Sequence, residues 1–218
     1  MKTLIVTGGI LHKEFAASFL EKNRYDYVIA VDAGVGYCKK LGIVPHMIVG
    51  DFDTYGTDRL REYEDNDVII RRFASEKDDT DTEIAMLEAA KRGGETDVLC
   101  AFGGRMDHML ANIHNLYLAM ERGIRARLVD EDNIIFLADE PFSVNKRDFP
   151  YKFVSFVPFA GEVTGIKLKG FKYPLNGYTL KPGYSRCISN EMTGDKAEVE
   201  FNNGILIVIN SDDKITSD

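Results

Sequence analysis

Short apolar runs alternate with amphipathic stretches along the first part of the chain. Apolar runs that are too short for a helix predict buried strands, and these are expected at residues 4–7, 27–31, 47–50, 68–70, 98–101 and 126–129. Apolar residues at helical spacing predict helices at 13–23, before 41, at 58–63, 82–92 and 108–122. This alternation predicts an α/β domain, a parallel sheet with flanking helices and right-handed crossovers.

The pattern changes near residue 137, after which no helical period is found. Strands are expected at 153–157, 163–168, 197–201 and 205–209, separated by turns rich in Gly, Pro and Asn. We therefore predict two domains, an α/β domain at 1–138 and an antiparallel β-sandwich at 139–218. About 80 residues is small for an independent core, so the sandwich should lean on the first domain or on a second subunit.

Composition and net charge exclude several kinds of protein. A net charge of −8 argues against a broad surface for nucleic acid or for anionic membranes. No apolar run approaches the ~20 residues that span a bilayer, and the N-terminus lacks the long apolar core of a signal peptide. The cysteines lie far apart, and Cys38 and Cys100 fall within apolar patterns, so we predict buried thiols there. A cytoplasmic location fits these features.

Two carboxylates directly follow the predicted strand at 47–50, namely Asp51 and Asp53. In open α/β sheets the carboxyl ends of the strands face the ligand crevice. Mg²⁺ takes oxygen ligands and is usually held by one or two carboxylates together with substrate phosphates. The simpler alternative is a turn in which these side chains accept hydrogen bonds from nearby backbone amides.

A second acidic cluster, EKDDTDTE, occupies residues 76–83 and follows the next strand. Thr80 and Glu83 form a capping-box pattern, and acids in a first helical turn complement the helix dipole. That explanation leaves Asp78 and its neighbour Asp79 unexplained. Both clusters should open on one sheet edge, together with Asp32. Since like charges about 4 Å apart repel by about 4 kcal/mol at an effective dielectric of 20, the acids are expected to share a cation.

A third feature is the segment GGRMDH at residues 103–108, at a predicted strand-to-helix turn. Glycine turns that open a helix let backbone amides approach phosphate oxygens, and the fork of Arg105 suits phosphate. A tight turn and a surface ion pair are the plainer alternatives. His108, Asn112 and Asn115 recur at helical spacing and predict a polar stripe on the helix. In the tail, the turns at 170–175 and 188–191 are polar or aromatic, for which ordinary loop chemistry suffices.

Taken together, these segments resemble the thiamine pyrophosphokinase family. The resemblance rests on GDFDT, EKDDTDTE, GGRMDHMLANI, GFKYPL and ISNE, which run in this order through nearly the whole chain. It implies an N-terminal Rossmann-like α/β domain, a C-terminal β-sandwich and a homodimer. It also implies transfer of the diphosphoryl group of ATP to the hydroxyl of thiamine, with Mg²⁺, to give thiamine diphosphate and AMP.

The resemblance also implies roles for individual residues. The magnesium site would comprise Asp51, Asp53 and one or both of Asp78 and Asp81, and Asp32 would lie near the substrate hydroxyl. ATP contacts would come from Lys77, Thr80, Gly103, Gly104, Arg105, Asp107, His108 and Asn112. Thiamine would be bound by Tyr173, Ser189 and Asn190.

The sequence departs from the family pattern at three points. Thr54 stands where the family usually has Ser, and His46 stands where many members have Asp, so the role of that position is open. The chain has no Trp, so the aromatic partner of thiamine is not assigned. Two other functions stay open: a magnesium phosphatase with Asp51 as nucleophile and Asp53 as acid, and a sensor that binds nucleotide or thiamine without turnover.

Overall fold

The apolar runs of the first part form one parallel sheet in the computed structural model, which describes residues 1–51, 63, 67–73 and 78–213. The first of two units, Met1–Glu131, contains this sheet. Its elements are β1 (Lys2–Val6), α1 (Lys13–Lys22), β2 (Tyr27–Val31), α2 (Gly34–Lys40), β3 (Met47–Gly50), β4 (Ile69–Arg72), α4 (Asp81–Ala90), β5 (Glu95–Leu99), α5 (Met106–Glu121) and β6 (Arg125–Val129). The strands are parallel in the order β6-β5-β1-β2-β3-β4.

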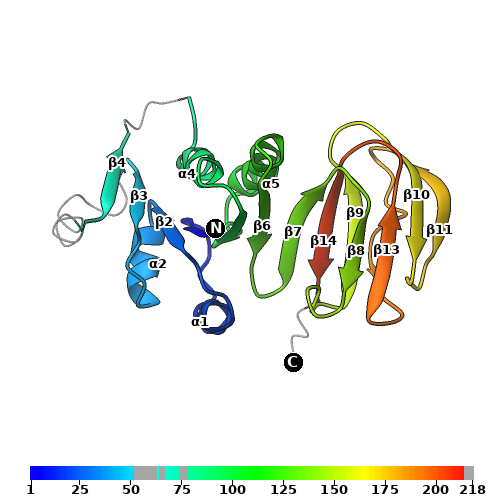
Figure 1. Ribbon diagram of the computed structural model, residues 1–218, viewed down its shortest axis with the longest axis horizontal. Coiled ribbons are helices and arrows are strands. Elements are labelled where there is room, and N and C mark those ends of the chain that lie inside the picture. The colour runs from blue at the N-terminus through cyan, green and yellow to red at the C-terminus, as the bar shows by residue number, and fades with distance from the viewer. Residues whose placement is uncertain (52–62, 64–66, 74–77, 214–218) are drawn as a thin grey trace. The chain divides into compact units, whose positions relative to one another are not determined.

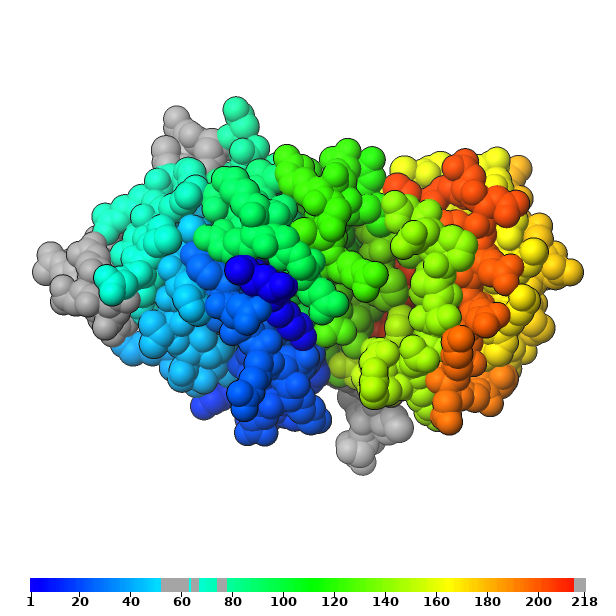
Figure 2. Space-filling model, in the orientation of Figure 1, coloured from blue at the N-terminus to red at the C-terminus, as the bar shows by residue number. Residues whose placement is uncertain are grey.

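Helices cover both faces of this sheet, with α1 and α2 on one face and α4 and α5 on the other (Figure 1). The helices α4 and α5 also pack against each other and form one continuous surface in Figure 2. Central strand residues such as Leu4, Ile29 and Ile48 are fully buried. Burial on both faces explains why these strands read as unbroken apolar runs in the sequence. The helix predicted at 58–63 lies outside the described residues apart from Tyr63.

The edge strand β4 is mostly exposed and is tied to α4 by a buried carboxylate. Glu88 of α4 is 4% exposed and accepts hydrogen bonds from Arg71 of β4 at 2.6 Å and from Lys91 at 2.7 Å. Burial alone would raise the pKa of Glu88, but the hydrogen bond from Lys91 and the charge of Arg71 lower it below its usual value. The edge strand is thus attached through charge as well as through its pairing with β3.

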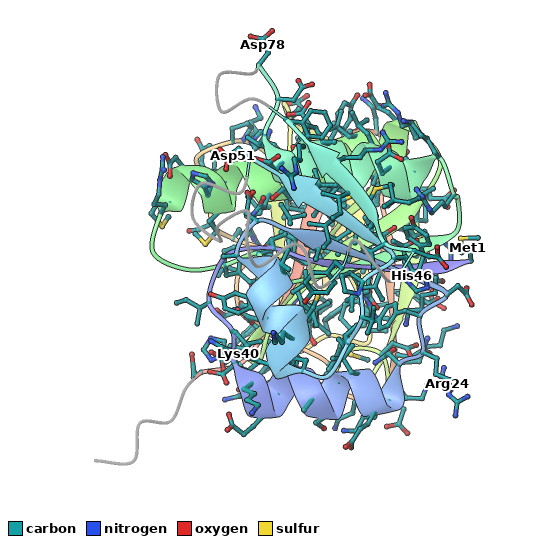
Figure 3. The ribbon with its side chains drawn as sticks, turned by 90° about the vertical axis from the view of Figure 1, so that its left-hand side faces the viewer. Met1, Arg24, Lys40, His46, Asp51 and Asp78 are labelled. Carbon is teal, nitrogen blue, oxygen red and sulfur yellow. The ribbon has the colours of Figure 1, made fainter. Side chains whose placement is uncertain are left out.

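His46 has a structural role at the amino end of β3. Its backbone N–H donates to the carbonyl oxygen of Val28 at 2.9 Å, and its Nδ1 accepts the Val28 N–H at 3.0 Å. Its ring stacks on Tyr27 with centroids 4.8 Å apart. Figure 3 shows His46 and Asp51 at opposite ends of the strand that joins them. His46 therefore extends the β2–β3 pairing and does not take part in the carboxyl edge of the sheet.

The second unit, Asp132–Asp218, is built from two antiparallel sheets. Its strands are β7 (Asn133–Ala138), β8 (Phe142–Asn145), β9 (Phe153–Pro158), β10 (Val163–Lys169), β11 (Leu175–Leu180), β12 (Asn190–Glu191), β13 (Lys196–Glu200) and β14 (Leu206–Ser211). Within this unit, hydrogen-bonded neighbours follow the order β12-β9-β14-β7, and a separate four-stranded sheet has the order β11-β10-β13-β8. Phe156, Phe171, Leu168 and Val208 belong to the apolar core of this unit. The predicted fold class, a parallel α/β sheet followed by a separate antiparallel β-unit, is confirmed.

The division between the units falls earlier than the predicted limit at residue 138. The strand Asn133–Ala138 pairs antiparallel with β14 along its whole length, from Asn133 opposite Ser211 to Ala138 opposite Leu206. The predicted limit rested on the change of pattern near residue 137, and no strand was expected at 133–138. Because β7 pairs with β14, it belongs to the second unit.

The three cysteines are free and buried, which confirms the prediction for Cys38 and Cys100. Burial raises the pKa of both thiols to about 12, so they stay protonated at neutral pH. In the described part of the chain, no helix combines the length and apolar character that crossing a membrane requires.

Candidate functional site

Two loops at the carboxyl edge of the parallel sheet are joined into one rigid base. The Gly9 N–H donates to the Cys100 carbonyl oxygen and the Ile10 N–H to that of Phe102, both at 2.8 Å. The hydroxyl of Thr7 also donates to the Cys100 carbonyl oxygen. A Cβ on Gly9 would lie 2.3 Å from both carbonyl oxygens, so only glycine permits this approach. The loop after β1 therefore fixes the loop after β5.

The Gly103-Gly104 turn rises from that base with an open backbone. Its φ angles are +127° and +38°, both in the region that favours glycine. A Cβ on Gly103 would lie 2.4 Å from Cγ1 of Ile10, whereas a Cβ on Gly104 would have no heavy atom within 4 Å. The helix α5 begins two residues later, so its first N–H groups adjoin the turn. This geometry suits an approaching phosphate, because free N–H groups and the helix dipole both favour an anion.

Arg105 and Asp107 form a two-contact ion pair at the start of α5. Arg105 donates from Nε to Asp107 Oδ1 at 3.1 Å and from Nη2 to Oδ2 at 2.6 Å. The His108 N–H donates to the same carboxylate at 2.9 Å. The Arg105 hydrogen bond and then the His108 N–H lower the pKa of Asp107 to about 2, so the carboxylate is ionised at neutral pH. Both side chains of the pair are mostly exposed, which leaves the guanidinium accessible to another anion.

The predicted polar stripe of α5 does not form one ligand surface. His108 is exposed, whereas Asn112 and Asn115 are each 8% exposed. The Nδ2 of Asn112 donates to the carbonyl oxygen of Ala101 at 2.7 Å, which attaches α5 to the loop after β5. Asn112 therefore holds the glycine turn in place, and its side chain is engaged by the protein's own backbone.

The candidate carboxylates stand at the ends of neighbouring elements. Asp32 directly follows β2 and has a φ of +48°, and its N–H donates to the carbonyl oxygen of Val49 at 3.0 Å. Asp51 directly follows β3 and is partly buried. Asp81 is the first residue of α4, and the Thr80 hydroxyl caps that helix by accepting the Glu83 N–H at 3.2 Å. This hydrogen bond confirms that Thr80 caps the helix, as the capping-box pattern predicted.

Figure 3 shows how two of these carboxylates lie. Asp51 and Asp78 both occur on the side of the view away from His46, and Asp78 points outward from the connection that leads into α4. Among the residues that the structure describes, no three His, Cys, Asp or Glu side chains are grouped closely enough to hold a metal ion. Asp53 and Lys77 lie outside the described residues. Because Mg²⁺ needs only one or two protein carboxylates beside substrate phosphates, the predicted metal site stays a prediction.

In the second unit, the residues predicted to bind thiamine divide into exposed and buried ones. Tyr173 is 57% exposed, and Asn190 is 3% exposed. Ser189 is exposed, has a φ of +54°, and is held by its N–H, which donates to Ser155 Oγ at 2.8 Å. A non-glycine residue with positive φ is uncommon and is often found where a side chain is presented for function.

Comparison with known proteins matches the two parts of the chain to two different domain families. The model for the thiamin pyrophosphokinase catalytic domain matches residues 20–128, and that for the thiamin pyrophosphokinase vitamin B1 binding domain matches residues 142–206. The thiamine pyrophosphokinase of Bacillus subtilis is 35% identical over 188 residues, 85% of this chain and 87% of the relative. The chain belongs to the thiamine pyrophosphokinase family.

Solved structures of thiamine pyrophosphokinases have the same fold. The Bacillus subtilis crystal structure matches with a TM-score of 0.87 and 32% identity over 98% of this chain and 100% of that one. The Geobacillus thermodenitrificans structure matches with a TM-score of 0.85 and 30% identity over 99% of both chains. The yeast enzyme, at 15% identity over 96% of this chain and 86% of that one, has a TM-score of 0.77 and shows the fold alone.

The sequence analysis did not include one part of the carboxyl edge of the sheet, the loop Thr7–Ile10 after β1. Gly8 and Gly9 alone do not make a dinucleotide-binding fingerprint. The signal was their position directly after the first strand, since a glycine pair there allows the close approach to Cys100 and Phe102. The loop supports the Gly103 turn and is not itself part of any of the family motifs quoted above.

Proposed function

We propose that this chain transfers the diphosphoryl group of ATP to the hydroxyl of thiamine, releasing AMP, with Mg²⁺ accompanying the nucleotide. The observation that carries the proposal is that catalytic and vitamin B1 binding family models match the two structural units in order. Phosphoryl-type transfer depends mostly on positioning and on neutralising charge. Positioning and charge neutralisation are both available at one place, formed by the open Gly103-Gly104 turn, the start of α5 and Arg105.

Particular residues can be given roles in the transfer step. The thiamine hydroxyl oxygen bonds to the β-phosphorus of ATP, and the bond from that phosphorus to the bridging oxygen of AMP breaks. The hydroxyl proton passes to a carboxylate, for which we propose Asp32 or Asp81. Asp32 suits this role because its backbone is fixed at the end of β2 by the bond to Val49. Phosphate oxygens would compete with Asp107 for the guanidinium of Arg105.

Mg²⁺ would be held by Asp51 and Asp53 together with one or both of Asp78 and Asp81, and it would neutralise phosphate charge. Hard carboxylate oxygens are the ligands that Mg²⁺ prefers.

We also propose a cytoplasmic homodimer in which the thiamine site is completed by the partner subunit. Buried free thiols suit a reducing compartment, and the exposed apolar side chains of Tyr184 and Ile188 suit an interface in the second unit.

The test is to mix protein, ATP, Mg²⁺ and thiamine and to follow AMP, with controls that lack thiamine or contain EDTA. AMP in the complete mixture alone supports the proposal. Phosphate release that ignores thiamine supports the phosphatase with Asp51 as nucleophile, and a thermal shift without AMP supports the sensor.

A single substitution then examines the metal site. Asp51→Asn should abolish AMP formation while the protein stays folded, because the amide removes a negative charge beside the phosphates. Asp26→Asn is a matched control at the opposite end of the sheet, where Asp26 is exposed and accepts the Lys2 N–H at 2.7 Å. Near-normal AMP formation by Asp51→Asn would contradict the assignment.

A further inference from the structure

The hydroxyl of Tyr37 is bonded to the loop that supports the glycine turn. Tyr37 lies on α2, and its hydroxyl donates to the carbonyl oxygen of Gly9 at 2.8 Å. The side chain is partly buried, and burial, followed by the neighbouring Cys100, raises the pKa of Tyr37 above its usual value. The hydroxyl therefore keeps its proton at neutral pH and remains a donor.

The helix that carries Tyr37 lies directly against the end of the first strand. A Cβ on Gly34, the first residue of α2, would overlap the carbonyl oxygen of Val6, so helix and strand meet with no side chain between them. The Val35 N–H donates to the carbonyl oxygen of Asp32 at 3.1 Å. Backbone contacts thus fix the start of α2 and, with it, the position from which Tyr37 reaches the loop.

Peptide groups extend this contact to the glycine turn. The carbonyl of Gly9 and the N–H of Ile10 belong to one peptide group. That N–H donates to the Phe102 carbonyl oxygen at 2.8 Å, and this carbonyl shares its peptide group with the N–H of Gly103. The peptide groups are trans, so the carbonyl and the N–H of each point in opposite directions. The hydrogen bonds therefore form one chain from the Tyr37 hydroxyl to the Gly103 N–H.

The Gly103 N–H stands at the open end of this chain. Within the part of the protein that the structure describes, it donates to no backbone carbonyl. Hydrogen bonds in a chain polarise one another, so an N–H becomes a stronger donor when the carbonyl of its own peptide group accepts a bond. Loss of the Tyr37 hydroxyl should therefore weaken the Gly103 N–H as a donor and loosen the loop that supports it.

We propose that Tyr37 is a positioning residue for the nucleotide, which acts through the Gly9 and Phe102 peptide groups and directs the Gly103 N–H toward a phosphate oxygen. The inference rests on the proposed function, because it takes the Gly103-Gly104 turn as the place of the ATP phosphates. Hydrogen bonds to a charged acceptor are roughly twice as strong as those to a neutral one, so weakening one donor has a measurable effect.

Two tyrosines at the opposite edge of the sheet are matched controls. The hydroxyl of Tyr25 donates to Asp97 Oδ2 at 2.6 Å. Tyr27 is the first residue of β2, and its buried hydroxyl has no hydrogen-bond partner among the described residues. Replacement by Phe removes one hydroxyl at each position, as it does at Tyr37. Tyr25→Phe thus reports the loss of a hydrogen bond away from the turn, and Tyr27→Phe the loss of a hydroxyl that makes none.

The experiment compares these three Phe variants in the full chain, by calorimetry with inorganic tripolyphosphate and by AMP formation. Tyr37→Phe should bind tripolyphosphate about threefold more weakly and raise KM for ATP by a similar factor, with KM for thiamine unchanged. Tyr25→Phe should lower the melting temperature and leave tripolyphosphate binding and both KM values unchanged. Tyr27→Phe should change none of these values.

Amide NMR spectra follow the chain of hydrogen bonds directly. In Tyr37→Phe the Ile10 amide proton should move upfield, because its bond to Phe102 weakens. The amide of Glu95, which donates to the Met1 carbonyl oxygen at 3.0 Å at the opposite edge, should not move. Where Tyr37→Phe does not fold, the unmodified chain is titrated with tripolyphosphate, and the Gly103 amide should shift.

Several results would overturn the inference. Equal weakening of tripolyphosphate binding in Tyr25→Phe would reduce Tyr37 to a contribution to overall stability. Unchanged binding or an unmoved Ile10 amide in Tyr37→Phe would break the chain of hydrogen bonds, and a Gly103 amide that ignores tripolyphosphate would remove its ligand. Failure of the proposed function would appear separately, as no AMP from the unmodified chain, while calorimetry and the amide spectra still test Tyr37.

Discussion

Two arginine–aspartate pairs in the first unit have similar geometry and opposite surroundings. Arg127 of β6 donates to both carboxylate oxygens of Asp97 in β5, and the second contact measures 3.2 Å. The Asp97 side chain is 3% exposed, and Tyr25 adds a hydrogen bond at 2.6 Å. Arg105 and Asp107 also make two contacts, but their side chains are 71% and 64% exposed.

The difference separates a structural pair from an exchangeable one. Burial alone would raise the pKa of Asp97, but the hydrogen bonds and charge of Arg127, the Tyr25 hydroxyl and the charge of Lys2 lower it below its usual range. The Nε and Nη2 of Arg127 both donate to this buried carboxylate, although the Arg127 side chain is 32% exposed. At the start of α5, water already competes for Arg105, so a phosphate can replace Asp107 at small cost. Exposure, more than geometry, identifies the pair that can serve a ligand.

The largest expected effect is on the buried pair. Asp97→Asn should lower the free energy of unfolding by about 2–3 kcal/mol, because it removes the buried carboxylate that Arg127, Lys2 and Tyr25 share, while the Arg127 side chain, 32% exposed, stays partly hydrated. Urea denaturation of both proteins measures the difference. Asn is nearly the same size as Asp, so a loss of packing does not account for the change. A decrease below about 1 kcal/mol would place this pair with ordinary surface pairs and remove the contrast.

Acid should weaken the buried pair in a defined window. The folded-state pKa of Asp97 lies below that of an unfolded Asp, about 3.9, so its contribution to stability is complete above that value. The contribution is lost as the pH falls through the folded-state pKa. The stability gap between the unmodified chain and Asp97→Asn should therefore be constant from pH 7 to about 5 and narrow in more acidic solution. Urea titrations over this range test it, and a gap that widens in acid would contradict the sign.

The sequence predicted the parallel sheet well because its strands are buried on both faces. The range of β3, 47–50, matches the prediction, and β2 does so as well. The strands β7, β8, β11 and β12 were not predicted. The range Leu175–Leu180 contains Asn176 and Gly177, and only Leu180 in it is fully buried, so no apolar run marks it. Half-exposed strands take their stability from pairing that the local pattern does not contain.

At the candidate site, the sequence does not distinguish side chains that contact a ligand from side chains that hold a loop. Motifs indicated Asn112 and Asn190 as ligand contacts, yet both amides are engaged by backbone. An asparagine that binds a ligand and one that holds a loop are the same residue type in the same motif. Only the hydrogen-bond partners separate the two roles. By contrast, other members of the motifs, Arg105, His108 and Tyr173, are exposed, and their contacts with ligands stay predictions.

The smallest effect is expected at the exposed pair. Asp107→Asn should leave the denaturation midpoint unchanged within error, because exposed ion pairs contribute little to stability. The same change frees the Arg105 guanidinium and removes a negative charge beside the Gly103-Gly104 turn. Inorganic tripolyphosphate should then bind about threefold more tightly by calorimetry, with the gain reduced in high salt.

Asp139→Asn, which removes an exposed carboxylate from the second unit, is the control for net charge alone. An equal gain there would mean that the overall charge of −8, and not the Arg105 pair, limits phosphate binding. Weaker binding by Asp107→Asn would mean that Asp107 orients Arg105 toward the phosphate more than it competes with it. In that case the exposed pair, like the buried one, would act as a fixed part of the structure, and the exchange argued for the start of α5 would fail.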